Sequence, residues 1–142
     1  MSIWFKPYTV EEINAFELED HMGTFLGIEI TRIGDDELEA RMPVDHRTRQ
    51  PQGILHGGAS VVLAETVGGL ASHLVIDPDK FYTVGLDINA NHLRQVKEGY
   101  VTAVCRPLKI GKTIHVWDIR ISNERQQMVC ISRLTMTVLS RK

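Results

Sequence analysis

The sequence has 142 residues, of which 43% are hydrophobic and 24% charged, and its formal net charge is −2. This balance is typical of one soluble globular domain spanning residues 1–142, and it excludes a disordered chain. The charge lacks the basic excess that binding to a nucleic-acid backbone requires. The first residues lack a signal peptide, and no apolar run approaches a membrane span in length. We therefore expect a cytoplasmic protein that binds neither nucleic acid nor membrane.

The first half of the chain predicts a helix, two strands and a loop. Thr9 is placed to cap a helix, and Glu12 would complete a capping box. Residues 28–33 and 38–44 alternate apolar and polar side chains on either side of a short acidic turn, which predicts two paired strands. Residues 45–56 show neither helical nor strand periodicity and contain Pro and Gly. They are expected to form a loop.

A long helix is predicted over residues 59–75, where apolar residues fall on almost every side, so we expect it to be buried nearly all round. Residues 81–93, 100–108, 113–122 and 128–139 predict consecutive antiparallel strands, because each alternates or is β-branched and the separators are short and polar. The sum is an α+β fold in which a curved antiparallel sheet of six strands wraps one helix. A single helix cannot cover such a sheet, so we expect at least a homodimer.

One acid, Glu65, stands inside this apolar helix. Burying an ionised carboxylate costs several kcal/mol, which leaves two interpretations. Glu65 is paired with an Arg or a neighbouring subunit, or lies at a wet helix edge; alternatively, it is a carboxylate tuned for catalysis. Gly68, Gly69 and Ser72 share its helix face, and the glycines indicate either space for a ligand or close helix packing across a dimer axis.

The start of this helix is a second candidate site. Gly57 and Gly58 lie where backbone N–H groups are unpaired, so they could bind a carbonyl oxygen, although an ordinary glycine-rich helix entry has the same sequence. His56 is either a donor to the same ligand or a core histidine. A metal site formed by His46, His56 and His92 matches no ligand spacing, so no metal is expected.

Two other sets of residues, two cysteines and five basic residues, have an ordinary structural interpretation. Cys105 and Cys130 match no zinc or redox spacing and are expected to be core thiols. Five basic residues lie within nineteen positions and form either a solvated face or a patch that takes phosphates, with Gly111 offering backbone donors. They are Arg94, Lys97, Arg106, Lys109 and Lys112.

Three segments together, residues 50–66, 85–94 and 107–112, resemble the hotdog-fold acyl-CoA thioesterases. The chain is most similar to the bacterial hydrolases of 1,4-dihydroxy-2-naphthoyl-CoA in menaquinone biosynthesis and to proofreading thioesterases that act on aryl carrier proteins. The resemblance extends from Trp4 to Leu139. It implies a hotdog fold, a homotetramer arranged as a dimer of dimers, an acyl-CoA or acyl carrier protein as substrate, and no metal or redox cofactor.

The resemblance also implies roles for particular residues. Glu65 stands at the catalytic carboxylate, which acts as nucleophile or general base, and Gln50 at a glutamine that places the thioester or the attacking water. His56 matches a histidine beside the thioester, and the Gly57 N–H polarises the thioester carbonyl. Gly69 stands where the family commonly has Ser or Thr. The implied coenzyme A segments comprise Gly85, then His92, Leu93, Arg94 and Gln95, then Lys109, Ile110, Gly111, Lys112, Thr113 and Ile114.

We therefore expect hydrolysis of an acyl-CoA with an aromatic acyl group, such as 1,4-dihydroxy-2-naphthoyl-CoA or benzoyl-CoA. Hotdog folds also support dehydratases and acyl-CoA binders without catalytic activity. A dehydratase of this fold pairs a histidine with an aspartate or glutamate in a different arrangement. In this sequence, residues 89–92 contain the histidine that could belong to such a pair. A proofreading thioesterase acting on an aryl carrier protein is the other alternative.

Overall fold

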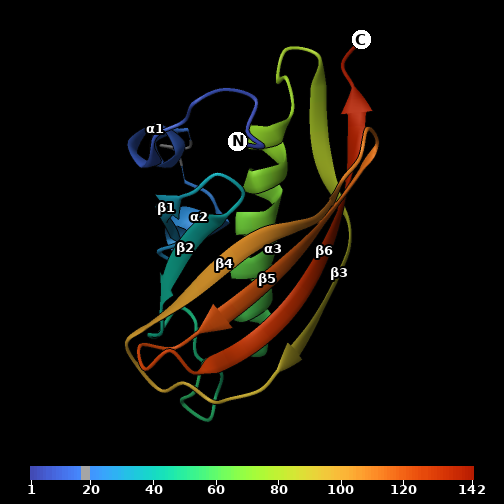
Figure 1. The fold of residues 1–142 in the computed structure, drawn as a ribbon. Helices are drawn as coiled ribbons and strands as arrows, with labels where there is room; N and C mark the ends of the chain where they lie inside the picture. Colours follow the sequence, from blue (N-terminus) through green and yellow to red (C-terminus); the bar gives the residue numbers. More distant parts are fainter. Residues whose placement is uncertain (17–19) are drawn as a thin grey trace.

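The computed structural model describes residues 1–16 and 20–142. One antiparallel sheet has the strand order β1-β2-β4-β5-β6-β3, and the long helix α3 lies along its concave side (Figure 1). This arrangement confirms the predicted α+β hotdog fold. The elements are α1 (Val10–Ala15), α2 (Met22–Phe25), β1 (Glu29–Ile33), β2 (Leu38–Pro43), α3 (Gly57–Val75), β3 (Phe81–His92), β4 (Tyr100–Ile110), β5 (Ile114–Ser122) and β6 (Met128–Ser140).

The N-terminal helix begins where the sequence predicts it. The side chain of Thr9 accepts a hydrogen bond from the Glu12 N–H at 3.1 Å, so Thr9 is the N-cap of α1. The following helix, α2, was not predicted from the sequence. It has four residues and is capped by the His21 side chain, and one turn is too short to produce a helical period.

The strand order differs in one respect from the expectation that neighbouring strands pair in sequence. β3 pairs with β6, whereas β4 pairs with β2. The alternation of a strand specifies which face is buried but not which strand lies beside it. Because α3 stands between β2 and β3 in the chain, β3 enters the sheet at the far edge, and its outer side has no partner among the described strands.

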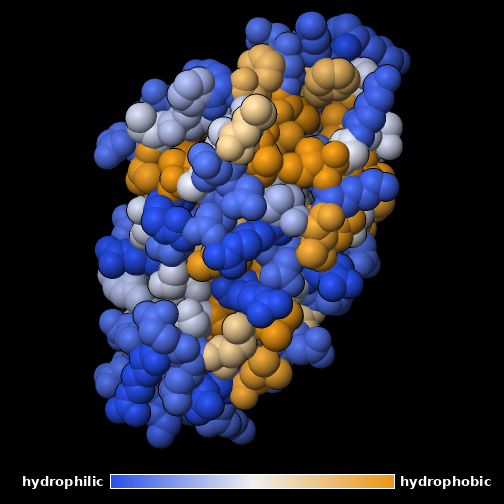
Figure 2. All heavy atoms as spheres, viewed as in Figure 1, coloured by the Kyte–Doolittle hydropathy of each residue, from blue (hydrophilic) through white to orange (hydrophobic). Residues whose placement is uncertain are grey.

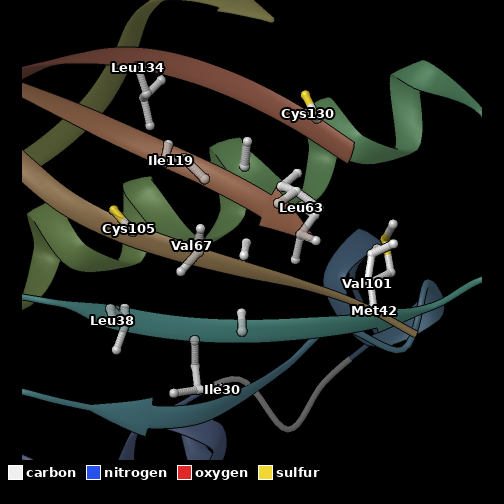
Figure 3. Close-up of a cluster of buried hydrophobic side chains, with 14 of the residues drawn as sticks. Ile30, Leu38, Met42, Leu63, Val67, Val101, Cys105, Ile119, Cys130 and Leu134 are labelled. Carbon is white, nitrogen blue, oxygen red and sulfur yellow. The ribbon is translucent and has the colours of Figure 1, made fainter. Parts of the chain in front are cut away.

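The core lies between α3 and the concave face of the sheet. Leu63 and Val67 of α3 are fully buried in one cluster with Ile119 and Leu134 of the sheet (Figure 3), and β3 adds partly buried side chains that pack against this cluster. Burying each such side chain contributes roughly 1.5–3 kcal/mol to stability. Cys105 is also buried there, and burial raises the pKa of its thiol. It is a core thiol, as predicted.

α3 is not buried all round, which corrects the sequence-based expectation. Leu63, Val67, Ala71 and Leu74 are fully buried, but Glu65 is exposed. The sheet curves around only part of the helix, so the face that carries Glu65 remains open. By length and composition alone the 19 residues of α3 would suffice to cross a membrane, but half of its most apolar stretch is buried inside the fold, as in the core helix of a globular domain.

The outer face of the sheet is largely polar, as the blue side chains over β4 and β5 show (Figure 2). Arg106 pairs there with Glu37, and Arg120 with Asp118. A polar outer face can remain in water. The composition of this face therefore does not require it to pack on another copy of the chain. The free edge strand β3 also carries exposed apolar side chains, at Val84 and Leu86.

Candidate active site

The N-terminus of α3 is capped by a histidine rather than by the usual Ser, Thr, Asp or Asn. His56 is the N-cap, and its Nδ1 accepts a hydrogen bond from the Gly58 N–H at 2.8 Å. The Gly58 N–H is therefore not free for a ligand, contrary to the expectation that both glycines offer donors. Because Nδ1 is the acceptor, a neutral His56 ring carries its proton on Nε2, and this exposed N–H can donate to a ligand.

The Gly57 N–H is the remaining donor at this helix start, since no group of residues 1–16 and 20–142 accepts from it. A Cβ at Gly57 would lie 2.8 Å from Nε2 of His92, so the His92 ring lies directly against this glycine. A side chain at position 57 would have to displace that ring, whereas glycine lets it approach the backbone. The structure thus places His92 at the start of α3, next to the residues predicted to hold the thioester.

Gln50 lies in the same region. It occupies a tight turn in which its carbonyl accepts from the Gly53 N–H at 2.9 Å, and Gly53 has a positive φ of 82°. The Gln50 side-chain carbonyl accepts from the Gln52 N–H. The amide NH₂ group of Gln50 is consequently the part that remains to donate to a ligand.

These residues border one cavity of about 420 Å³. It brings together six of the residues predicted for the site, but His56, the N-cap of α3, is not one of its lining residues. The six are Gln50, Gly57, His92, Leu93, Arg94 and Gln95. The Arg94 guanidinium is the cation at this cavity, so an anionic ligand entering here would meet it.

Two arginines that the sequence analysis did not single out hold the loop that carries Gln50. Arg49 donates from Nε and Nη2 to the Lys97 carbonyl, at 3.0 and 2.9 Å. Arg47 donates to both carboxylate oxygens of Asp45 and to the Phe25 carbonyl. Arg47 lowers the pKa of the Asp45 carboxyl to about 2. The signal in the sequence was the pair of arginines flanking Thr48 in a loop without periodicity.

Glu65 belongs to a second, larger cavity of about 1170 Å³, which lies between α3, β3 and the α1–α2 region. A Cβ at Gly85 of β3 would lie 2.6 Å from the Glu65 carboxylate oxygen Oε2, so the strand leaves room for this carboxylate. Gly69, one turn further along α3, also lines the cavity, and a Cβ there would meet only Met136, at 3.8 Å. Space beside Glu65 is therefore present at Gly69, which favours the first of the two interpretations of the glycines.

Gly68 and Ser72 serve the core instead, which corrects the expectation that they face the carboxylate. A Cβ at Gly68 would lie 2.5 Å from Leu134, so this glycine lets α3 approach β6. The Ser72 Oγ accepts from Trp117 Nε1 at 2.7 Å and hydrogen-bonds His115 Nδ1 at 3.0 Å. Gly68 is three residues from Glu65, so its direction from the helix axis differs by about 60°, which here separates the cavity from the core.

The basic residues form no single patch within one chain. Arg94 follows the end of β3 that pairs with Cys130, whereas the turn holding Lys109 and Lys112 lies next to Val138. These points are about eight residues apart along β6, which corresponds to roughly 25 Å. Arg106 pairs with Glu37 on the outer face of the sheet.

The two cavities expose different groups that could take part in hydrolysis. The Gly57 N–H and the Glu65 side chain are eight residues apart on one helix, which separates them by roughly 12 Å along the axis and about 80° around it. A backbone donor aimed at a carbonyl oxygen and a carboxylate near open space are the groups that acyl transfer to water requires. The arrangement defines an α+β hotdog protein equipped for hydrolysis of an acyl group.

Comparison with known proteins gives the family. The model of the Thioesterase superfamily matches residues 52–130. The chain is 50% identical over 137 residues to 1,4-dihydroxy-2-naphthoyl-CoA hydrolase of Escherichia coli, covering 96% of this chain and 99% of that protein. It is 47% identical over 140 residues to a proofreading thioesterase of Cronobacter turicensis, covering 96% and 98%.

A solved structure of a mutant thioesterase from Pseudomonas aeruginosa matches with a TM-score of 0.96 at 48% identity, over 99% of this chain and 100% of that one. A thioesterase from Haemophilus influenzae matches with a TM-score of 0.92 at 49% identity, over 97% and 95%. The chain belongs to the Thioesterase superfamily and is a thioester hydrolase.

Proposed function

We propose that this chain hydrolyses the thioester of an aromatic acyl-CoA. One observation carries the proposal: the free Gly57 N–H at the start of α3 shares a cavity with Gln50 and His92, while Glu65 of the same helix borders a larger cavity. The first group can stabilise charge on a thioester oxygen, and the second can deliver the attacking oxygen.

The donors at the helix start act on the carbonyl. The Gly57 N–H lies at the positive end of the α3 dipole, where it stabilises the negative charge that develops on the thioester oxygen. The Gln50 amide NH₂ can orient the thioester or a water. The His56 Nε2–H is directed outward by the hydrogen bond at Nδ1 and can donate to the same substrate.

Glu65 supplies the attack. Acting as a base, it takes a proton from water while the water oxygen bonds to the carbonyl carbon; acting as a nucleophile, its own oxygen forms the bond and water then releases the acid. In both cases the carbon–sulfur bond breaks and the sulfur leaves as a thiolate that takes up a proton. The exposed position of Glu65 in one chain gives water access to it.

We propose that the complete site forms between two copies. Within one chain the Gly57 N–H and Glu65 face different cavities, so they cannot both reach one thioester. β3 has a free edge, with Val84 and Leu86 exposed on it. Antiparallel pairing of β3 with its own copy, centred near Ile88, would set the His92 end of one strand opposite the Val84–Gly85 region of the other. The donors of one subunit would then face Glu65 of the partner subunit.

The same pairing bears on the coenzyme A moiety. The two basic regions lie at opposite ends of the sheet in one chain, and antiparallel association would bring Arg94 of one copy toward the end of the sheet that carries Lys109 and Lys112 in the other. Cations from both subunits could then bind the phosphates of one coenzyme A. Pairing of two such dimers into a tetramer is part of the proposal.

The aromatic acyl group is supported by the larger cavity and by the relatives. About 1170 Å³ bordered by Leu70, Val84 and Met136 accommodates a flat apolar group, and most of a ligand of this kind is buried by such walls. A relative of comparable identity is named a proofreading thioesterase, so a carrier-protein thioester is the second candidate. The ratio of kcat/KM for one aryl acid on coenzyme A and on a carrier protein decides between them.

The test of the proposal is Glu65→Gln, measured by thiol release from benzoyl-CoA. Loss of the base or nucleophile should lower kcat by about 10²–10⁴-fold while the circular dichroism spectrum is unchanged. Glu29→Gln, on the exposed face of β1, is the control and should retain wild-type turnover. A folded Glu65→Gln protein with near-normal turnover would refute the role of this carboxylate.

A further inference from the structure

The cavity that contains Glu65 continues along α3 to His73. Thr66, Gly69, Leu70 and His73 all line it, and their spacing of three, four and seven residues places them on one face of the helix. Glu65 and His73 are eight residues apart, which is roughly 12 Å along the axis. The cavity therefore has a Glu65 end and a His73 end.

The course of β3 agrees with this assignment of the two ends of the cavity. Gly85 lies beside Glu65, and residues 76–80 alone connect the end of α3 to the start of β3. Tyr82, near that start, accordingly lines the His73 end. The Tyr82 ring is covered by the Arg141 guanidinium at 5.4 Å, so it forms a fixed wall.

The His73 ring is positioned by packing and not by hydrogen bonds from its nitrogens. Phe16 packs against it edge-on, with the ring centroids 6.1 Å apart. Neither ring nitrogen has a hydrogen-bond partner in the part of the chain that the structure describes, and the side chain is half-buried. An imidazole in this state offers one donor and one acceptor to whatever occupies the cavity.

We propose that His73 is a specificity residue that hydrogen-bonds a polar substituent, such as a phenolic hydroxyl, at the far end of a bicyclic aromatic acyl group. This rests on the proposed function, because it assumes that the acyl group enters this cavity from Glu65. Gly69 and Leu70 form the apolar stretch between the two ends, where the rings would lie. A single-ring acyl group is too short to span from the carbonyl to His73.

The experiment uses four substrates in two matched pairs. The long pair is 6-hydroxy-2-naphthoyl-CoA and 2-naphthoyl-CoA, and the short pair is 4-hydroxybenzoyl-CoA and benzoyl-CoA. The wild type should prefer the hydroxylated member of the long pair by about threefold to tenfold in kcat/KM, which is the effect of one hydrogen bond between neutral groups. His73→Leu should abolish this preference and leave the ratio for the short pair unchanged.

Two further variants separate recognition from packing. His73→Gln keeps a donor and an acceptor and should retain part of the preference. His46→Leu, at a histidine whose side chain is 86% exposed, should behave as the wild type. Retention of the preference by His73→Leu, absence of any preference in the wild type, or an equal loss on all four substrates would overturn the inference. If the wild type hydrolysed none of the four thioesters, the proposed function would fall and this inference with it.

Discussion

At the scale of single residues, His115 forms a buried polar cluster with Ser72 and Trp117 that takes no part in the proposed chemistry. Its side chain is 1% exposed, and burial lowers the pKa of its imidazole. The folded protein thus disfavours the charged ring. A protonated His115 would also need acceptors for two N–H groups, and Ser72 Oγ is the one partner described for it.

We predict that this histidine makes the protein less stable as the pH falls from about 6.5 to 5. In this range the unfolded chain binds a proton at residue 115 that the folded chain does not bind, so the free energy of unfolding decreases with falling pH. The largest contribution is about 1.4 kcal/mol per pH unit. Urea unfolding of the wild type and His115→Gln at several pH values measures it, and the variant should show the shallower slope.

His46→Gln, at an exposed histidine, is measured beside His115→Gln as the control for the loss of an imidazole. Carboxylates such as Asp45, with a pKa lowered to about 2, titrate below this window and do not contribute to it. An unchanged slope in His115→Gln would show that another group causes any acid sensitivity.

The candidate residues show what the sequence could reveal at this scale. Glu65 stood out because an acid in an apolar helix is unusual, and the prediction located it correctly on α3. The expectation that Glu65 is buried was wrong, because a helical pattern does not reveal how far a sheet curves around the helix. The contact between Gly57 and His92 joins residues 35 positions apart, and no local pattern could have predicted it.

At the scale of elements, α3 carries two adjacent glycines with different surroundings. Gly68→Ala should destabilise the protein, because a Cβ would lie 2.5 Å from Leu134 and overpacking of this kind costs roughly 1–3 kcal/mol. Gly69→Ala should stabilise it by up to about 1 kcal/mol, because the position is open and alanine favours the helix. Thermal unfolding of both variants measures the difference.

Gly69→Ser tests the catalytic side of the same contrast. A hydroxyl one turn from Glu65 can orient the carboxylate, an effect of about 1 kcal/mol or up to roughly tenfold in rate. We expect a higher kcat on benzoyl-CoA and no gain on a naphthoyl-CoA, where the added atoms occupy ligand space. Gly69→Ala is the control, because it fills the space without the hydroxyl. Identical rates for the serine and alanine variants would exclude a role for the hydroxyl.

The strands show which structural features can be predicted from the local sequence. The extents of β4, β5 and β6 agree with the alternation in the sequence to within two residues, and their consecutive pairing follows from short turns. The place of β3 depends on where α3 returns the chain, which is a property of packing. The two basic groups were predicted to be close because they are close in sequence, but an extended β4 separates them.

At the scale of the whole molecule, the free edge of β3 is the surface that we propose to pair with a second copy of the chain. Leu86 is 62% exposed and lies at a register shift between Gly85 and Asp87, so it is not paired with β6. A long edge strand with exposed apolar side chains is unusual in a monomer, because it offers unpaired backbone groups to another chain. The separation of Glu65 from the Gly57 N–H gives a functional reason for the same association.

We predict that Leu86→Lys disrupts the dimer, because a lysine at a sheet edge disfavours strand pairing and replaces an apolar side chain that the pairing would bury. The variant should have a lower molar mass by light scattering and should lose thioesterase activity together with the dimer, while its circular dichroism spectrum stays folded. Activity should rise with protein concentration as dimers reform.

Leu108→Lys is the matched control, since Leu108 is 55% exposed on β4 and lies away from the β3 edge. It should keep the wild-type molar mass. Mixing the Glu65→Gln protein with a Gly57→Pro protein, which lacks the N–H of residue 57, sharpens the test, because a mixed dimer would contain one intact pair of Gly57 and Glu65 contributed by different chains. Recovery of activity in that mixture requires a site shared between subunits, whereas a fully active monomeric Leu86→Lys protein would show that each chain is catalytically complete.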